Sequence, residues 1–382
     1  MKQLLAYCLS IILCVSFTGC MENYLDLYPE DKITSASFPE NESDIKLLLN
    51  GVYAQLREKE VYNQGLFGFG ITDGATPNAF NWGTDEVFNK LGAGRLSSSD
   101  GGVVTYRWKR CYEIISRANY LLACMDLVDL SEEAKAKYSG ETHFLRGLAY
   151  SVLAETYGGV PIILTNISTE EARSLKRASL EETWQQALDD YEVAITNLGV
   201  DAPEPGRATK GAALGMKMRA YLYQGKYKEV LACVEQIDAL KKYGLFHSYE
   251  GLFDPANENN KEVLFDIQYI EGENSQGSYI DQYCGTGTGS WTRGSRYVPT
   301  DDLVAAYETI DGSPVDPENP YENRDPRLGF TAVLPGSYFL GYRFPNYLYP
   351  GGAFNHAGNR LKHFRMSQSF LLPGSLISMI SY

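Results

Sequence analysis

The stretch that decides the fold reads Ala220-Tyr221-Leu222-Tyr223-Gln224-Gly225-Lys226-Tyr227. Apolar residues recur at helical spacing on both sides of it, at Leu214, Met218, Tyr221 and Leu222 and again at Tyr227, Leu231, Val234 and Ile237. A glycine commonly follows the last turn of a helix, because it adopts the left-handed backbone that other residues avoid. We therefore expect two helices that meet at Gly225 and fold back on each other as a hairpin.

The two tyrosines that flank this glycine, Tyr221 and Tyr227, have the spacing typical of tetratricopeptide repeats. In that architecture a small residue at the turn lets the two helices approach, and the flanking aromatic rings fill the gap between them. The repeat pattern is incomplete, because Val230 stands where alanine is usual. The prediction is an all-α dominated fold of tetratricopeptide-like helical hairpins, an α-α superhelix, with a loop-rich face and minor β structure.

Other segments carry the same helical periodicity of apolar residues. They lie at residues 45–56, 108–122, 145–156 and 184–198. Ser43 is the expected cap of the first helix, and Gly158, Gly159 and Pro161 mark the end of the third. The aromatic residues on these stripes are interpreted as core residues, and they are Trp108, Tyr150, Trp184 and Tyr221.

The character of the sequence changes after Gly244. The short apolar run from Glu262 to Ile270 is typical of a strand. Residues 271–360 are rich in Gly, Pro, Tyr and Asn, and residues 62–105 have little helical pattern but contain several aromatic side chains. We expect both regions to form loops on the helical frame, where loops commonly carry function.

The composition excludes several kinds of function. The 382 residues include 34 basic and 48 acidic side chains, a net charge of −14, whereas a nucleic-acid partner would need basic patches. The 4 histidines have no metal-ligand spacing and the 7 cysteines form no CxxC pair, so we predict no metal and no cofactor. Cys111 and Cys124 lie about 20 Å apart along one helix at 1.5 Å per residue. Free buried thiols are the favoured interpretation for these two, and for Cys233 and Cys284.

The start of the chain carries a targeting signal. Lys2 precedes an apolar run, Leu4 to Phe17, which is shorter than the about 20 residues that a membrane-spanning helix needs and fits a signal peptide. The run ends in Ser16-Phe17-Thr18-Gly19-Cys20, the pattern of a lipoprotein signal. We predict that residues 1–19 are removed, that Cys20 is lipidated, and that residues 20–40 tether the chain to a membrane. The alternative is an ordinary secretory signal in which Cys20 is incidental.

No motif for catalysis stands out. Residues 285–290 are glycine-rich but lack the lysine of a phosphate-binding loop, and no G-x-S-x-G nucleophile elbow is present. Arg324-Asp325-Pro326-Arg327 is interpreted as a structural corner, since the residue before a proline favours extended or turn backbone. The chain is therefore predicted not to be an enzyme.

Six segments, in this order, resemble the SusD/RagB family of outer-membrane nutrient-binding lipoproteins. They are Cys20–Asp31, Leu49–Tyr53, Trp108–Asn119, Phe144–Pro161, Gly206–Ala213 and Asn323–Leu328. The resemblance implies a single domain at residues 41–382, a surface-exposed position on the outer membrane, an oligosaccharide ligand, and a SusC-type TonB-dependent transporter as partner. Nothing after Lys362 resembles the family's C-terminal helices, so we expect these to be missing or altered.

Sugar binding needs flat aromatic faces against the C–H side of a ring, with amide, carboxylate or guanidinium groups for its hydroxyls. Two clusters outside the helical stripes combine these groups, Asp73, Asn78, Asn81 and Trp82 in one loop and Trp291, Arg293, Arg296 and Tyr297 in another. They form the predicted ligand site. A peptide-binding protein and a protein-interaction scaffold of helical repeats remain alternatives, as does a secreted glycosidase, because the separation of paired catalytic carboxylates is spatial.

Overall fold

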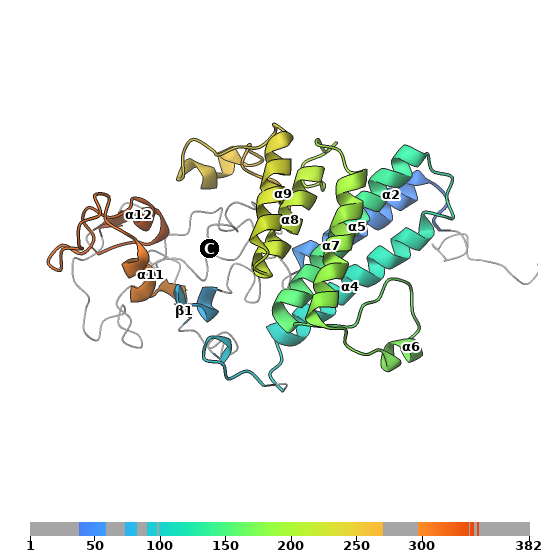
Figure 1. Cartoon of the computed structure of the whole chain (residues 1–382), viewed down its shortest axis with the longest axis horizontal. Coiled ribbons are helices and arrows are strands. Elements are labelled where there is room, and N and C mark those ends of the chain that lie inside the picture. The colour runs from blue at the N-terminus through green and yellow to red at the C-terminus, as the bar shows by residue number, and fades with distance from the viewer. Residues whose placement is uncertain are drawn as a thin grey trace, which may run out of the picture.

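A computed structural model describes residues 38–58, 73–81, 90–97, 99–269, 297–335, 337–339 and 342–343. The long helices of this part are α2 (Glu42–Tyr53), α4 (Val103–Cys124), α5 (Glu132–Tyr157), α7 (Leu180–Asn197), α8 (Lys210–Tyr223) and α9 (Tyr227–Ala239). Figure 1 shows them packed side by side, with α11, α12 and β1 towards the other end of the molecule. Helices dominate and the strands are short, which confirms the predicted all-α dominated fold.

Helix α5 lies at the centre of the helical frame. It packs against α4 and α7, and the stack continues from α7 to α8 and from α8 to α9. Nearly every residue from Gly140 to Ala154 is buried, and a helix that is buried on all sides has no single apolar stripe. The periodicity therefore located only residues 145–156 of a helix that begins at Glu132. Its start is capped by Ser131, whose Oγ accepts a hydrogen bond from the Ala134 N–H at 3.2 Å.

The hairpin of α8 and α9 confirms the predicted turn. Gly225 stands between the two helices with φ of 69°, in the left-handed region that favours glycine. The prediction that both flanking tyrosines fill the gap is wrong for Tyr227, whose side chain is 67% exposed, whereas Tyr221 packs against the core. The face of α9 that meets the core carries residues at i, i+3 and i+7, namely Val230, Cys233 and Ile237.

The first helix begins at Glu42, and its cap is Asn41 rather than the predicted Ser43. The Oδ1 of Asn41 accepts hydrogen bonds from the backbone N–H groups of Ser43 and Asp44, at 2.9 and 3.2 Å. Asparagine and serine cap helices about equally well, so the sequence pattern did not distinguish the two neighbours. At its other end the helix continues into a 3-10 turn, η1 (Ala54–Arg57).

The strand predicted at residues 262–270 is wrong for residues 262–269, the portion that the structure describes. These residues pair with no strand there. Leu264, Phe265 and Ile267 are instead buried in the same core as the helices. Phe265 packs edge-on against Phe144 of α5, with ring centroids 4.9 Å apart. The apolar run reflects burial against helices, which a short stretch of sequence does not distinguish from strand pairing.

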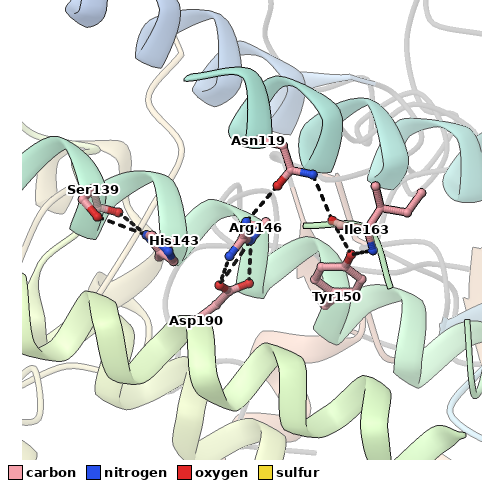
Figure 2. Close-up of polar contacts among 7 residues, drawn as sticks. All are labelled: Asn119, Ser139, His143, Arg146, Tyr150, Ile163 and Asp190. Carbon is pink, nitrogen blue, oxygen red and sulfur yellow. Dashed lines mark hydrogen bonds and ion pairs between the residues drawn. The ribbon is translucent and has the colours of Figure 1, made fainter. Parts of the chain in front are cut away.

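A buried polar network joins α4, α5 and α7 (Figure 2). Arg146 of α5 donates to the carboxylate of Asp190 on α7, with Nη2 at 2.7 Å from Oδ1 and Nε at 3.0 Å from Oδ2. Its Nη1 donates to Oδ1 of Asn119 on α4 at 2.8 Å. The Asn119 amide and the Tyr150 hydroxyl both donate to the Ile163 carbonyl, at 2.9 and 3.0 Å. Because buried charges need partners, the network fixes how these helices sit against one another.

The buried cysteines agree with the predicted free thiols. Cys111, Cys124 and Cys233 are free and buried. Cys111 and Cys124 both lie on α4, as the periodicity indicated. Cys284 lies outside the described residues.

We expect Cys111 to resist alkylation in the native protein. Burial raises the pKa of its thiol to about 12, and only the thiolate is nucleophilic. Iodoacetamide treatment at neutral pH, followed by peptide mass spectrometry, should leave Cys111 unmodified in the folded chain and modify it in urea. Equal modification of Cys111 in both conditions would contradict its burial.

Candidate ligand-binding face

Two short strands bring the backbone of one residue from each predicted cluster together. Strand β1 (Ala79–Asn81) pairs antiparallel with β2 (Tyr297–Pro299), and Asn81 stands opposite Tyr297 in the register. Residues that are directly opposite in such a pair have Cβ atoms about 4.5–5.5 Å apart. Residues 79–81 and 297–299 are therefore neighbours, although they are distant in sequence. We call the surface around this strand pair the β1–β2 face.

The turn before β1 is built around Thr76. Its Oγ1 donates to the Asp73 carbonyl at 2.9 Å and accepts from the Asn78 N–H at 3.2 Å. These bonds fix the backbone at two of the predicted site residues. Within the described residues the side-chain amide of Asn78 has no hydrogen-bond partner, and the residue is half-buried. This amide is therefore available to a ligand.

Thr300 joins the strand pair to α11 (Asp301–Ala306). Its N–H donates to the Asn78 carbonyl at 3.0 Å, and its Oγ1 donates to the Pro77 carbonyl. The same Oγ1 caps α11 by accepting from the Leu303 N–H at 3.1 Å. One threonine thus connects the turn before β1, the end of β2 and the first turn of α11, which lie together in Figure 1.

Arg324 forms the structural corner that the sequence predicted. Its side chain is buried, and its guanidinium donates at 2.5 to 2.6 Å to three backbone carbonyls, those of Val304, Tyr307 and Pro320. An arginine whose N–H groups already donate to backbone carbonyls has few donors left for a ligand. Arg324 therefore positions the end of α11 and does not belong to the β1–β2 face.

The other predicted site residues are described in part or not at all. Asn81 and Tyr297 are described through their backbone alone. The remaining candidates lie outside the described residues, and they are Cys20, Trp82, Trp291, Arg293 and Arg296. Their parts in lipidation and ligand binding stay predictions.

The sequence analysis did not single out a pocket that lies at the end of α2. This pocket has a volume of about 200 Å³ and is bounded by the end of α2 with η1, by the turn at Pro205–Arg207, and by Phe265–Gln268. None of its lining residues belongs to the two predicted clusters. Three segments that are distant in sequence build it, so no spacing within one segment indicated it. We call it the α2 pocket.

Metal chemistry and membrane spanning find no support in the described residues. No group of His, Cys, Asp and Glu side chains there is arranged to hold a metal ion. Of the helices in this part of the chain, none combines the length and the apolar character that crossing a membrane requires. The Nδ1 atom of His143, one of the four histidines, lies 2.8 Å from the carbonyl oxygen of Ser139, one turn earlier on α5 (Figure 2).

Helices that stack one on the next, from α4 through α5, α7 and α8 to α9, define the frame of a helical-repeat type of protein. A sequence profile described as "Starch-binding associating with outer membrane" matches residues 23–222, and the SusD family profile matches residues 261–369. The chain belongs to the SusD-like family, which confirms the resemblance seen in its six segments.

Relatives and solved structures agree with this assignment. SusD-like protein P25 of Formosa agariphila is 26% identical over 321 residues, which cover 78% of this chain and 58% of that protein. A SusD-like carbohydrate-binding protein of Bacteroides fragilis has a TM-score of 0.69 and 28% identity, over 79% of this chain and 61% of that one. Another SusD-like protein of B. fragilis has a TM-score of 0.68 and 26% identity, over 81% and 64%. The chain thus spans about 60% of the length of these relatives.

Proposed function

We propose that this protein captures oligosaccharides at the cell surface and delivers them to a SusC-type TonB-dependent outer-membrane transporter. The observation that supports the proposal is the pairing of β1 with β2, in which Asn81 of one predicted sugar-binding cluster stands opposite Tyr297 of the other. The family description, which names starch binding and association with the outer membrane, supports it. So does the similarity to the B. fragilis structure, which is of a SusD-like carbohydrate-binding protein.

Binding at the β1–β2 face follows from the chemistry of its residues. The indole rings of Trp82 and Trp291 offer flat apolar faces to the C–H side of a sugar ring. The backbone N–H of Asn78 donates to Thr76, and the side-chain amide of Asn78 supplies donors and an acceptor for hydroxyl groups. The protein then captures its ligand without altering it, and selectivity comes from the loops.

The proposed division of the chain into signal peptide, lipid anchor, tether and domain is based on the lipoprotein signal at its start. Residues 1–19 are the signal peptide, Cys20 carries the lipid, and residues 20–40 are the tether. Residues 41–382 form one SusD-like domain that sits over the transporter barrel as a lid. A lipid on Cys20 anchors the chain and leaves the domain free to move against the barrel.

Replacing both Trp82 and Trp291 by alanine should weaken oligosaccharide binding roughly 30-fold or more, as expected when aromatic residues that dominate the binding energy are lost. A glycan array identifies the oligosaccharide, and isothermal titration calorimetry measures the change in Kd. Tyr227→Ala is the matched control, because Tyr227 is an aromatic residue that is 67% exposed on α9. This control should bind as the wild type does.

Each alternative function has its own outcome in these measurements. Full oligosaccharide binding by the double variant would overturn the assignment of the ligand to this face and favour a scaffold of helical repeats. Binding of peptides with no binding to any glycan on the array would favour the peptide-binding alternative. Release of new reducing ends from an oligosaccharide by the pure protein would establish a glycosidase.

A further inference from the structure

The walls of the α2 pocket are held by bonds among the protein's own residues. Arg207 donates to Oδ1 of Asn50 at 2.5 Å, lies 3.4 Å from the Glu141 carboxylate, and stacks on the Tyr53 ring with its Cζ 5.0 Å from the centroid. The Tyr53 hydroxyl donates to Glu141 at 2.7 Å and accepts from the Ala208 N–H at 2.9 Å. The helix end and the turn at Pro205–Arg207 are therefore fixed before any ligand arrives.

The third wall meets this turn at a glycine. Gly206 has φ of 80°, and a Cβ added to it would lie 2.8 Å from Cγ of Gln268. Only glycine combines that backbone with such close packing. The sequence thus brings Phe265–Gln268 against the turn and closes one side of the pocket.

Asp266 is a buried acidic residue of the pocket lining. Asp266 is 6% exposed. In the part of the chain that the structure describes, its side-chain donor is the Gln268 amide, at 2.7 Å from Oδ2, and no Lys or Arg forms an ion pair with it. Burial raises the pKa of this carboxyl. A buried carboxylate that accepts a single side-chain hydrogen bond retains strong acceptor capacity.

Arg57 supplies the opposite charge to the same pocket. It is half-buried, lines the pocket, and within the described residues it has neither an ion-pair nor a hydrogen-bond partner. Arg57 and Asp266 carry opposite formal charges, which sum to zero in the lining, and the charge of Arg207 is met by Glu141. The pocket therefore suits a ligand without net charge whose groups both donate and accept.

The size of the pocket limits the ligand further. About 200 Å³ is less than the about 300–1,000 Å³ of pockets for drug-sized ligands. The lining combines polar residues with the apolar residues Leu56, Phe265 and Ile267. Adjacent hydroxyls on a ring with apolar C–H faces match this combination of size, neutrality and mixed lining.

We propose that the α2 pocket is a second binding site, separate from the β1–β2 face, which takes a single sugar ring. Asp266 accepts hydrogen bonds from ring hydroxyls, and Arg57 donates to a neighbouring hydroxyl. The proposal rests on the proposed function only for the class of ligand, since its residues are different. A chain with both sites holds an oligosaccharide at one face and a terminal sugar or a free monosaccharide at the other.

Saturation-transfer NMR on the full chain tests this, with glucose, galactose, mannose, xylose and N-acetylglucosamine offered one at a time. We expect at least one of them to bind, and Asp266→Asn and Arg57→Gln each to weaken that binding roughly tenfold, the effect of losing a hydrogen bond to a charged group. Arg173→Gln is the control, because Arg173 is exposed on α6 (Thr169–Ser174). Arg57 is only half-buried, so its variant tests the site even where Asp266→Asn unfolds the chain.

The outcomes separate the two sites. Binding of no monosaccharide, or binding that neither pocket variant weakens, overturns the second site. The proposed function does not depend on this second site. It is still supported if the variant that lacks both Trp82 and Trp291 loses oligosaccharide binding. Glycine is offered as a small zwitterion, and binding of glycine with no binding of any sugar also overturns the proposal. Loss of monosaccharide binding in the pocket variants, with oligosaccharide binding at the β1–β2 face retained, supports it.

Discussion

Asp190→Ala should lower the free energy of unfolding by about 3–5 kcal/mol, the usual cost of removing one partner from a buried ion pair. The Arg146 and Asp190 side chains are 7% and 2% exposed. Without the carboxylate, the Arg146 guanidinium keeps only Oδ1 of Asn119 as a side-chain acceptor. The guanidinium charge stays buried in the variant, so the cost of its desolvation is no longer compensated. Urea unfolding followed by circular dichroism measures the loss.

The neighbouring carboxylate provides a matched control. Asp189 is exposed and accepts a hydrogen bond from Nε2 of Gln185 at 2.8 Å. Asp189→Ala should change the free energy of unfolding by no more than about 0.5 kcal/mol. The double variant Arg146→Met with Asp190→Leu should recover much of the stability, since an apolar pair of similar volume replaces a buried ion pair at little cost. Equal losses for Asp189→Ala and Asp190→Ala would contradict the buried network.

This pair of carboxylates shows where prediction from sequence ends. The stripe at residues 184–198 located α7, and helical periodicity located the other long helices, because one face of each is apolar. Asp189 and Asp190 are chemically identical and adjacent on that helix. Only the position of Arg146 on α5 makes one of them structural, and that position depends on packing between helices that are distant in sequence.

The β1–β2 face shows the same limit of prediction from sequence. Residue types selected the two loops as candidates, because aromatic rings and amides occur there outside any helical stripe. Their pairing was not predicted, since a strand of three residues, such as β1, is too short to display alternation. The α2 pocket lies further beyond the reach of the sequence. Asp266 stands in a run that the sequence predicted as a strand, and its significance appears only when the fold brings it into the same pocket lining as Arg57.

Phe144→Ala should lower the free energy of unfolding by about 3–5 kcal/mol, the range for a buried phenylalanine cut to alanine. Phe144 has no exposed surface. Its ring packs on Tyr191 of α7 and on Phe265, with centroids 6.3 and 4.9 Å away. The missing ring leaves a cavity between α5 and the segment that carries Asp266. Tyr227→Ala, which removes an exposed ring, should change stability by no more than about 0.5 kcal/mol.

The same variant should loosen one wall of the α2 pocket while the chain stays folded. Phe265 contacts Phe144 directly, so backbone amides at residues 264–268 should exchange hydrogen faster in Phe144→Ala, whereas amides of α9 should follow the change in global stability. Hydrogen exchange measured by mass spectrometry distinguishes the two segments. A uniform increase along the chain would mean that Phe144 supports only the global fold. A local increase at residues 264–268 would mean that the helical core itself holds this wall of the α2 pocket in place, and that monosaccharide binding there depends on a residue that touches no ligand.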